Sequence, residues 1–475
     1  MIFNFKQKNL IKKFFENDKV FDIQIIGAGI AGISLAYFLI KINPYLRILL
    51  IERGDFISKA EAKKQMNGVK FNGLEIKNDS RVFGVGGSSI TWGNIISNIT
   101  KDEVSNKWPL EFNELRSFCD RAAKILNLDN SSIDNLKPYE RKFNYSFNPI
   151  NFQKFLDTSK VDLLYNCKVE KIFERQNVNF SKINFKKKNF FIKSKKTILC
   201  SGTLEIIRLL FNSSKDKKSL RVNKNVLGKY FMNHPKLTIG EIKYIDKKIN
   251  IRKYLLKKNG EKLSYIGISL PNNKKKKLKL LNSYVKFKPK IYSLLENRID
   301  KTPKLFEKIK DVFYLKILKF LDKFDYFLKK RIFLIQIFME MEPNKKNRVT
   351  INKKNQINVI NHLSKKDIRT IVILRDFIIK NFSLNENDEK KINLSKKLVY
   401  KFAKDASHHI GGTVFNKNKK KSFIDKNLKI LGTKNTFICS SSVFPTAGSV
   451  NPTLLILALG LRLSKFLTKT LNNGK

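Results

Sequence analysis

Residues 22–32 read Asp-Ile-Gln-Ile-Ile-Gly-Ala-Gly-Ile-Ala-Gly, and residues 47–52 read Arg-Ile-Leu-Leu-Ile-Glu. The apolar run before the glycines predicts a strand, and the run after them predicts a helix. The second stretch predicts another strand that ends in an acid. Strand, glycine turn, helix and strand in this order are typical of a unit that binds a dinucleotide. The alternative is a glycine-rich turn in an ordinary α/β unit.

Each glycine of the motif has a physical role in such a unit. Gly27 permits the tight turn that leaves the strand, Gly29 lets the backbone approach a pyrophosphate, and Gly32 lets the helix pack closely on the strand. The helix N-terminus then presents N–H groups and a positive dipole end to the phosphates. Glu52 lies 20 residues beyond Gly32, where its carboxylate can accept hydrogen bonds from ribose hydroxyls.

The composition predicts a folded chain of two or three domains, because 475 residues with 42% hydrophobic content can bury a large core. The formal net charge of +56 is compatible with nucleic acid or an anionic membrane as partner. However, lysine is spread over the whole chain and is not concentrated with arginine and aromatic residues, as it is at base-reading sites. We therefore interpret the charge as compositional bias on solvated faces and expect no nucleic-acid partner.

Cysteine usage and hydropathy indicate the compartment. The four cysteines form no Cys-x-x-Cys pair, so we expect neither a disulfide framework nor a metal site. Residues 1–20 lack the apolar core of a signal peptide, and no run reaches the ~18 apolar residues that span a bilayer. We expect a cytoplasmic protein. For two basic amphipathic segments, 1–20 and 304–331, packing on the core is the first interpretation and peripheral contact with the inner face of the membrane is the alternative.

A second glycine-rich stretch occupies residues 84–94 and reads Gly-Val-Gly-Gly-Ser-Ser-Ile-Thr-Trp-Gly-Asn. Glycines beside two serines and a tryptophan predict a loop whose backbone approaches a ligand, and we expect it to cover a cofactor. A buried strand, 196–200, ends in Ser201-Gly202-Thr203 and is followed at once by a helix. Small residues at such a strand end again favour close approach of a ligand.

The C-terminal part returns to glycine-rich sequence. Residues 407–413 read Ser-His-His-Ile-Gly-Gly-Thr, and a helix is predicted to begin at Asn451-Pro452, because Asn caps helices well and Pro suits the first helical position. The apolar residues that follow predict that this helix is buried. A buried helix N-terminus needs a polar or negative group in front of it.

In these motifs the chain resembles the glucose-methanol-choline (GMC) oxidoreductases, FAD-dependent enzymes that act on alcohols and sugars. The most specific parts of the resemblance are the loop GVGGSSITWGN and the tail SSSVFPTAGSVNPTLLILALGLRLS. The resemblance implies noncovalent FAD, because the neighbourhood of the loop tryptophan carries no histidine for covalent attachment. The residues expected to bind FAD are Gly27, Gly29, Gly32, Glu52, Gly86, Gly87, Ser88, Trp92, Asn94, Val169, Gly202, Val450 and Thr453.

The resemblance also implies catalytic roles. His409 stands at the position of the catalytic histidine and would accept the hydroxyl proton as hydride leaves the carbinol carbon for flavin N5. Asn451 would hydrogen-bond the substrate oxygen and orient the C–H bond. His408 is adjacent on an extended segment, where its side chain would point the other way. We interpret His408 as structural and His234 as structural or as a residue of the domain junction, with a catalytic role as the alternative for each.

The expected fold is an α/β FAD-binding Rossmann-like domain in three layers, with a second α+β substrate domain built on an antiparallel sheet. The FAD-binding domain is expected in two segments, 1–235 and 405–475, and the substrate domain at 236–404. Alternating residues predict strands of the substrate domain at 237–245, 264–270, 283–289, 332–342, 347–352 and 357–362.

The expected function is that of an FAD-dependent dehydrogenase or oxidase that takes hydride from a CH–OH group of a sugar, polyol or other alcohol. The sequence does not identify the electron acceptor. One alternative is a flavoenzyme of other chemistry, such as a sugar isomerase or reductase. The other is a non-catalytic basic protein that binds RNA or a membrane on a flavoprotein fold.

Overall fold

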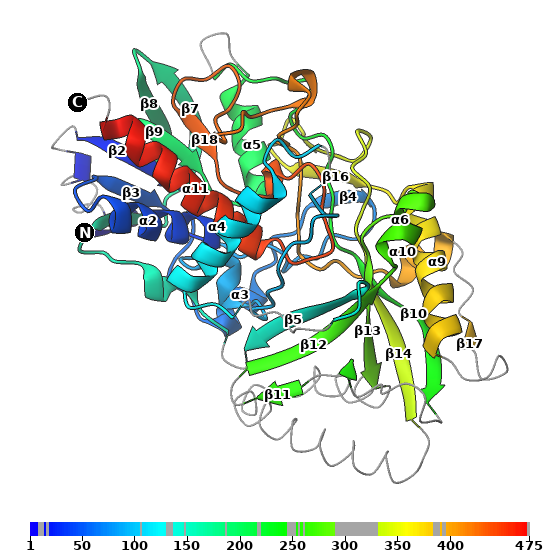
Figure 1. Cartoon of the computed structure of the whole chain (residues 1–475). Coiled ribbons are helices and arrows are strands. Elements are labelled where there is room, and N and C mark those ends of the chain that lie inside the picture. Colours follow the sequence, from blue (N-terminus) through cyan, green and yellow to red (C-terminus); the bar gives the residue numbers. More distant parts are fainter. Residues whose placement is uncertain are drawn as a thin grey trace.

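The computed structural model describes residues 1–7, 14–15, 19–104, 107–129, 136–146, 149–185, 188–215, 220–244, 253–254, 257–259, 262–289, 331–382, 390–391 and 396–472. Two bodies lie side by side, each built around its own sheet (Figure 1). The predicted helix at 304–331 falls, except for its last residue, outside the described residues.

The first sheet contains the predicted dinucleotide unit. Its central strands are parallel, and β7, β8 and β9 continue it as an antiparallel meander. The strand order is β1 (Ile2–Asn4), β6 (Val161–Tyr165), β3 (Ile48–Ile51), β2 (Val20–Ile26), β9 (Lys188–Leu199), β8 (Val178–Phe185) and β7 (Val169–Arg175). Where β8 ends, β18 (Thr436–Ile438) pairs in parallel with the end of β9. The C-terminal part of the chain thus returns to this sheet, as the sequence predicts.

Helices cover the first sheet. On one face, α11 (Thr453–Asn472) packs against α2 (Ile30–Ile42) and α4 (Phe112–Ile125) (Figure 1). Phe38 of α2 is fully buried there, and a Cβ added to Gly460 of α11 would lie 3.9 Å from its ring. A further helix, α5 (Thr203–Ser213), packs against β7 and follows the small residues that end β9.

The second sheet is antiparallel, as predicted for the substrate domain. It runs in the order β11 (Lys257–Asn259), β12 (Lys262–Ser269), β13 (Tyr284–Pro289), β14 (Arg331–Phe338), β10 (Lys236–Tyr244) and β17 (Lys390–Lys391), with β5 (Glu140–Ser146) paired on β12. The strand β5 comes from the segment expected to belong to the FAD-binding domain. Two helices, α9 (Lys365–Phe382) and α10 (Lys396–Phe402), pack against β10.

The remaining described elements are a third sheet and several short helices. The predicted strands 347–352 and 357–362 do not join the second sheet: they form β15 (Arg348–Ile351) and β16 (Ile357–Asn361) of a separate sheet with β4 (Lys70–Gly73). The short helices are α3 (Lys59–Lys64), α6 (Asn272–Lys277), η1 (Gly87–Ile90), η2 (Phe152–Phe155), η6 (Lys419–Lys421) and η7 (Ser441–Val443).

The N-terminal segment joins the core. Its β1 pairs in parallel with β6, and Phe3, Phe5 and Phe14 are buried. These three residues therefore pack in the core, which is the first of the two interpretations of segment 1–20. Among the described ranges, no helix combines the length and the apolar character needed to cross a membrane.

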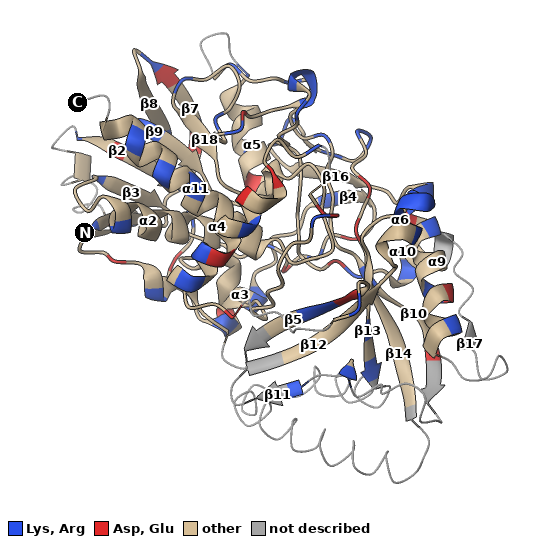
Figure 2. Cartoon of the chain, in the orientation of Figure 1, with Lys and Arg blue, Asp and Glu red and all other residues tan. Residues whose placement is uncertain are grey.

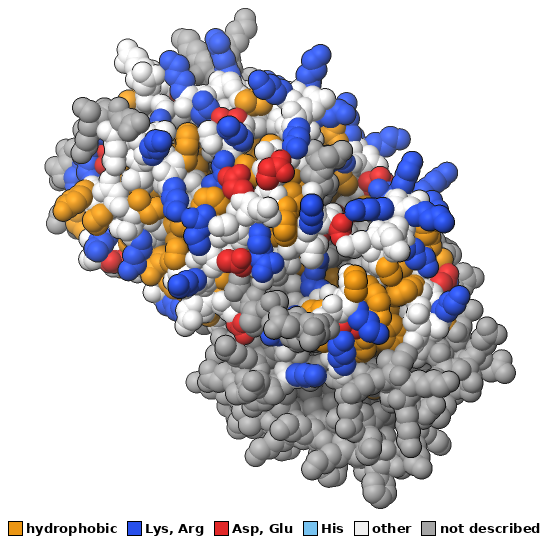
Figure 3. All heavy atoms as spheres, viewed as in Figure 1, with side chains coloured by type: hydrophobic (Ala, Val, Ile, Leu, Met, Phe, Trp, Pro, Cys, Tyr) orange, Lys and Arg blue, Asp and Glu red, His pale blue; other side chains and the backbone are white. Residues whose placement is uncertain are grey.

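The positive charge is dispersed. Lys and Arg lie on the helices and strands of both bodies (Figure 2). On the face shown in Figure 3, they alternate with acidic, uncharged and apolar side chains and do not gather into one patch. The described part of this face therefore carries no single continuous basic patch.

Candidate active site

The first glycine turn leaves no room for a side chain at Gly27 or Gly32. Gly27 follows β2 with φ of +107°, and a Cβ there would lie 2.6 Å from Cα of Ser201. A Cβ on Gly32 would lie 1.9 Å from the carbonyl oxygen of Gly27, so α2 packs directly on the turn. At Gly29 the nearest atom to such a Cβ is 3.8 Å away, and the N-terminus of α2 stays approachable at this point.

The second glycine loop lies against the first. Gly86 donates its N–H to the carbonyl of Ala28 at 2.7 Å. A Cβ on Gly87 would lie 2.8 Å from Cα of Gly29, and the next residue, Ser88, is exposed. Two stretches that are distant in sequence therefore form one backbone-lined surface at the N-terminus of α2, where an anion binds well.

Trp92 and Asn94 hold the far end of this loop. Trp92 donates its Nε1–H to the carbonyl of Ile150 at 2.9 Å and packs edge-on against Phe152. Asn94 adopts a φ of +52° and is buried, and its Oδ1 has no hydrogen-bond partner among the residues that the structure describes. Because an unpaired buried acceptor is costly, this oxygen is open to a donor from a bound group.

Glu52 ends β3 as a buried acid. Its Oε2 accepts the N–H of Ala28 and its Oε1 accepts the N–H of Gly54, each at 2.9 Å. Burial raises the pKa of this carboxyl, although both bonds oppose the shift. Each carboxylate oxygen can accept a further hydrogen bond, so a ribose hydroxyl would find an acceptor here.

A hollow of about 520 Å³ lies near the end of β3 and the start of β7, although neither Glu52 nor Val169, the buried first residue of β7, lines it. Their chain neighbours Arg53 and Lys168 line it, together with Glu205 of α5. At the start of α5, Gly202 has a φ of +77°, and no atom lies within 4 Å of the position of a Cβ. Of the two cofactor residues predicted here, Gly202 borders open space, whereas Val169 is buried.

Three arginines surround Glu205 at this hollow. Arg81 Nη1 lies 2.6 Å from Oε1 and Arg208 Nε donates to Oε2 at 2.8 Å, while Arg53 Nη1 lies 3.7 Å from Oε1. Burial opposes ionisation of Glu205, but Arg208 and Arg81 outweigh it and hold the pKa of Glu205 below its usual value. The sequence does not predict this cluster.

Among the C-terminal residues singled out in the sequence, His408 and Asn451 are in contact. Asn451 Nδ2 lies 3.2 Å from His408 Nε2. On its other side, His408 Nδ1 lies 3.1 Å from Nδ1 of His234, with the two rings perpendicular. Burial, with a contribution from His234, lowers the pKa of His408 to about 3, so the ring is neutral at ordinary pH.

His409 points elsewhere, as expected for neighbours on an extended segment. Its ring is buried, and its Nε2 lies 3.6 Å from Asp405 Oδ2, beyond hydrogen-bond distance. Asp405 Oδ1 accepts from Asn233 Nδ2 at 2.6 Å and from the N–H of Ser407 at 2.7 Å. Although burial opposes it, His409 and these bonds hold the pKa of Asp405 well below its usual range. The geometry therefore separates His409 from Asn451, the partner predicted for it.

Asn451 stands immediately before the long buried helix. The first intrahelical bond of α11 runs from the N–H of Ile456 to the carbonyl of Pro452, so the helix begins at Thr453, two residues after the predicted cap. Val450 and Thr453 are buried on either side of Asn451. The helix N-terminus thus lies next to the histidine pair, and its dipole favours a negative group in front of it.

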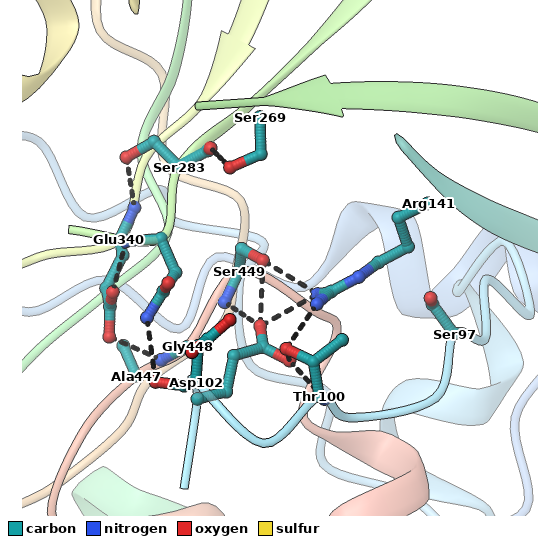
Figure 4. A network of polar contacts seen from close by, with 12 residues as sticks. Ser97, Thr100, Asp102, Arg141, Ser269, Ser283, Glu340, Ala447, Gly448 and Ser449 are labelled. Carbon is teal, nitrogen blue, oxygen red and sulfur yellow. Dashed lines mark hydrogen bonds and ion pairs between the residues drawn. The ribbon is translucent and has the colours of Figure 1, made fainter. Parts of the chain in front are cut away.

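Two buried carboxylates hold the loop that carries Asn451 (Figure 4). Glu103 Oε1 accepts from the N–H of Ser449 at 2.7 Å, from its hydroxyl at 2.8 Å and from Arg141 Nη1 at 2.8 Å. Glu340 Oε1 accepts the N–H of Gly448 at 2.9 Å. Burial opposes ionisation of Glu103, but Arg141 and the backbone donors lower its pKa to about 2.

Sequence reasoning misses this network, since its members look like ordinary surface charges. The one signal available in the sequence is the low number of acidic residues, 40 against 96 basic ones. An acidic residue among apolar neighbours is therefore a candidate for a buried ion pair. Arg141 lies on β5 of the second sheet, and Ser449 lies in the loop before α11. The network therefore ties the substrate side to the predicted catalytic loop.

Comparison with known proteins agrees with this architecture. Residues 343–460 match a family model described as GMC oxidoreductase, while no curated protein sequence matches the chain. The solved structure of pyridoxine 4-oxidase from Mesorbium loti is similar, with a TM-score of 0.60 at 11% identity over 94% of this chain and 98% of that one. Formate oxidase is similar with a TM-score of 0.62 at 13% identity over 96% of this chain and 99% of that one. A formate oxidase variant from Aspergillus oryzae RIB40, studied for its effect on FAD modification, gives the same values.

Proposed function

We propose that this chain, a GMC oxidoreductase by the family match of residues 343–460 and by its fold, oxidises a CH–OH group of a small alcohol, with a sugar or polyol as first candidate. The observation that carries the proposal is the contact of His408 Nε2 with Asn451 Nδ2 at 3.2 Å. A neutral base and an amide donor from two separate segments meet in front of a buried helix N-terminus. No observation favours an isomerase, a reductase or an RNA-binding role.

The proposed base is His408 in place of the predicted His409. Both histidines lie more than 40 residues before Asn451 in sequence, but the contact with the amide belongs to His408, and His409 lies beside Asp405. The low pKa of His408 keeps its ring unprotonated at neutral pH, as a base requires. His409 is then a support for the segment, held beside the buried carboxylate of Asp405.

The two side chains divide the work on the substrate. A hydroxyl oxygen that lies within hydrogen-bond distance of both nitrogens would pass its proton to His408 Nε2 and would accept a hydrogen bond from Asn451 Nδ2. This arrangement fixes the oxygen and thereby limits the directions in which the C–H bond can point. Bound FAD would supply the two-electron acceptor for the hydride that leaves the carbon.

Three observations support FAD as the cofactor: the backbone-lined surface at Gly29 and Gly87, the unpaired acceptor of Asn94, and the open space at Gly202. The binding is proposed to be noncovalent. The residues proposed to hold the cofactor remain Gly27, Gly29, Gly32, Glu52, Gly86, Gly87, Ser88, Trp92, Asn94, Val169, Gly202, Val450 and Thr453. A cytoplasmic location is supported by the four cysteines, which are all free and buried.

The first experiment is anaerobic mixing of the purified flavoprotein with a panel of alcohols while the visible flavin band is followed. The panel contains sugars and polyols, together with pyridoxine and formate because the similar structures are oxidases named for them. Bleaching by a member of the panel is the expected result. Acid precipitation of the protein should release the flavin to the supernatant, and flavin that stays with the pellet would contradict noncovalent binding.

A matched pair of variants tests the base. His408→Ala should lower the rate of flavin reduction by about 10²-fold or more, and His409→Ala should affect it less. The reverse order would return the role to His409. A protein that neither carries nor takes up FAD would refute the proposed function as a whole.

A further inference from the structure

His234 is buried next to His408, and its surroundings determine where it carries a proton. Its Nε2 faces two backbone carbonyls, that of Gly448 at 2.9 Å and that of Ala447 at 3.2 Å. A carbonyl oxygen can only accept a hydrogen bond. The proton of His234 therefore lies on Nε2, because a lone pair there would face two oxygen atoms.

A neutral imidazole carries one ring proton, so the other nitrogen of His234 is an acceptor. The ring is neutral because burial lowers the pKa of His234 to about 4. Its Nδ1 lies 3.1 Å from Nδ1 of His408. Two lone pairs cannot share this contact, so His408 must donate from Nδ1, and its own single proton is then placed there.

The consequence reaches the substrate side of the ring. With its proton on Nδ1, neutral His408 has a lone pair on Nε2, and this nitrogen faces Asn451 Nδ2, a donor. We propose that His234 is a positioning residue that holds His408 in the tautomer whose Nε2 carries a lone pair. The carbonyls of Ala447 and Gly448 make this possible because they fix the proton of His234 on its own Nε2. This role deepens the proposed function and rests on His408 as its base.

The neighbouring charges do not replace His234 in this role. Asp405 is the nearest carboxylate, and its oxygens accept from Asn233, Ser407 and Lys77. Glu103 and Lys236 act on the pair through space. The segment that carries the carbonyls of Ala447 and Gly448 is itself held by Glu340, which accepts the N–H of Gly448.

The tautomer can be measured directly in the intact flavoprotein. The chain contains four histidines, so histidine labelled with ¹⁵N gives few ring signals, and the ¹⁵N shift distinguishes a protonated from an unprotonated ring nitrogen. Each signal is assigned by its loss in a single variant. The expected result is a resting enzyme with His408 protonated on Nδ1 and His234 protonated on Nε2. A wild-type His408 protonated on Nε2 would overturn the proposal, whatever the variants do.

Two substitutions at one position separate positioning from packing. His234→Gln offers an amide with a donor and an acceptor, whereas His234→Leu offers neither. In the Leu variant, His408 should shift toward the Nε2–H tautomer, and the rate of flavin reduction should fall about tenfold with little change in KM. The Gln variant should restore most of both. His362→Gln is the control, since His362 lies beside Tyr400 and Asn347.

The outcomes distinguish the two proposals. If the tautomers are as expected but no alcohol of the panel bleaches the flavin, the proposed function fails and the tautomer assignment stands. If alcohols bleach the flavin but His234→Leu leaves the His408 tautomer unchanged, His234 is not the positioning residue. Should the Leu variant fail to fold, the wild-type spectrum still decides.

Discussion

Replacing Glu103 by Gln should destabilise the protein and loosen the loop that presents Asn451. The carboxylate of Glu103 accepts two hydrogen bonds from Ser449 and pairs with Arg141. Glutamine has nearly the same shape but carries no charge. Arg141 would then remain largely buried, with 17% of its side chain exposed and no carboxylate beside it.

The magnitude follows from the pKa of Glu103. The folded protein lowers this pKa from 4.5 to about 2, and each pKa unit corresponds to about 1.4 kcal/mol. The ionised form is thus favoured by about 3 kcal/mol in the folded state relative to the unfolded chain. The Glu103 side chain is only 4% exposed, so solvent screening reduces this value little. Removing one partner of a buried pair typically costs about 3–5 kcal/mol, which agrees.

The sign of the pH dependence is also predicted. Because the folded pKa lies below the unfolded one, the contribution of Glu103 is complete above pH 4.5 and is lost as the pH falls through about 2. Urea unfolding of wild type and Glu103→Gln, at one FAD concentration and at several pH values, measures the difference. We expect about 3 kcal/mol at pH 7 and a smaller difference below pH 4.5.

A double variant provides the control. In Glu103→Gln/Arg141→Gln both charges are absent, so it should recover part of the stability lost by Glu103→Gln alone. If wild type and Glu103→Gln differ in unfolding free energy by less than about 1 kcal/mol at pH 7, the reasoning is refuted. The buried pair of Glu103 and Arg141 would then stabilise the fold no more than an exposed salt bridge does. A difference that does not change with pH would refute the reasoning as well.

Further substitutions probe other parts of the structure. Gly32→Ala would place a methyl group 1.9 Å from a backbone oxygen, so the purified variant should lack bound flavin, as its visible spectrum would show. Gly460→Ala is the control and should retain the flavin, because its added methyl group would have its nearest contact at 3.5 Å. The stability of His408→Gln relative to wild type should rise as the pH falls below 6.5, by up to about 1.4 kcal/mol per pH unit. In wild type the unfolded chain binds a proton at this histidine near pH 6.5, whereas the folded protein binds it only near its pKa of about 3, so acid favours unfolding of wild type alone. Urea unfolding at pH 6.5 and pH 5 measures the difference in stability, and a difference that does not change with pH would contradict the prediction. Glu205→Gln leaves two largely buried guanidinium groups without their carboxylate and should cost about 3–5 kcal/mol; an unchanged thermal unfolding midpoint of the flavoprotein would count against it.

The parts of the fold that could be predicted depend on local constraints. The turn at Gly27 and the packing at Gly32 are visible in sequence because each requires the absence of a Cβ within a few residues of chain. The strands β10, β12 and β13 begin and end within two residues of their predicted bounds, since alternation of apolar residues is a local property of a half-buried sheet. The solved structures confirm the predicted fold class.

The parts that could not be predicted depend on distant partners. The three residues of β1 pair with a strand about 160 positions away, and β5 leaves the segment of the first sheet to pair with β12. A strand pattern states which face is buried but not which sheet receives it. Edge strands of two or three residues also carry too little pattern to detect.

The candidate site shows the same division. Alternation along the extended segment predicts that His408 and His409 point in opposite directions, and the two side chains contact different partners. Which of them faces Asn451 depends on how the segment docks against His234 and α11, which no local pattern contains. The pairs of Glu103 with Arg141 and of Glu205 with Arg81 remain hidden for a similar reason: burial turns an ordinary charge into a structural one only after the chain has folded.

The return of the chain end to the first sheet has a consequence for synthesis. A ribosome releases β2, α2 and β9 long before it makes β18 and α11, which complete their edge and cover their face. Until then the apolar surface around Phe38 and the open edge of β9 are presented to the cell by an unfinished chain. Exposed apolar surface and unpaired strand edges are what promote aggregation of folding intermediates. This topology therefore leaves the first sheet incompletely covered until β18 and α11 have been synthesised.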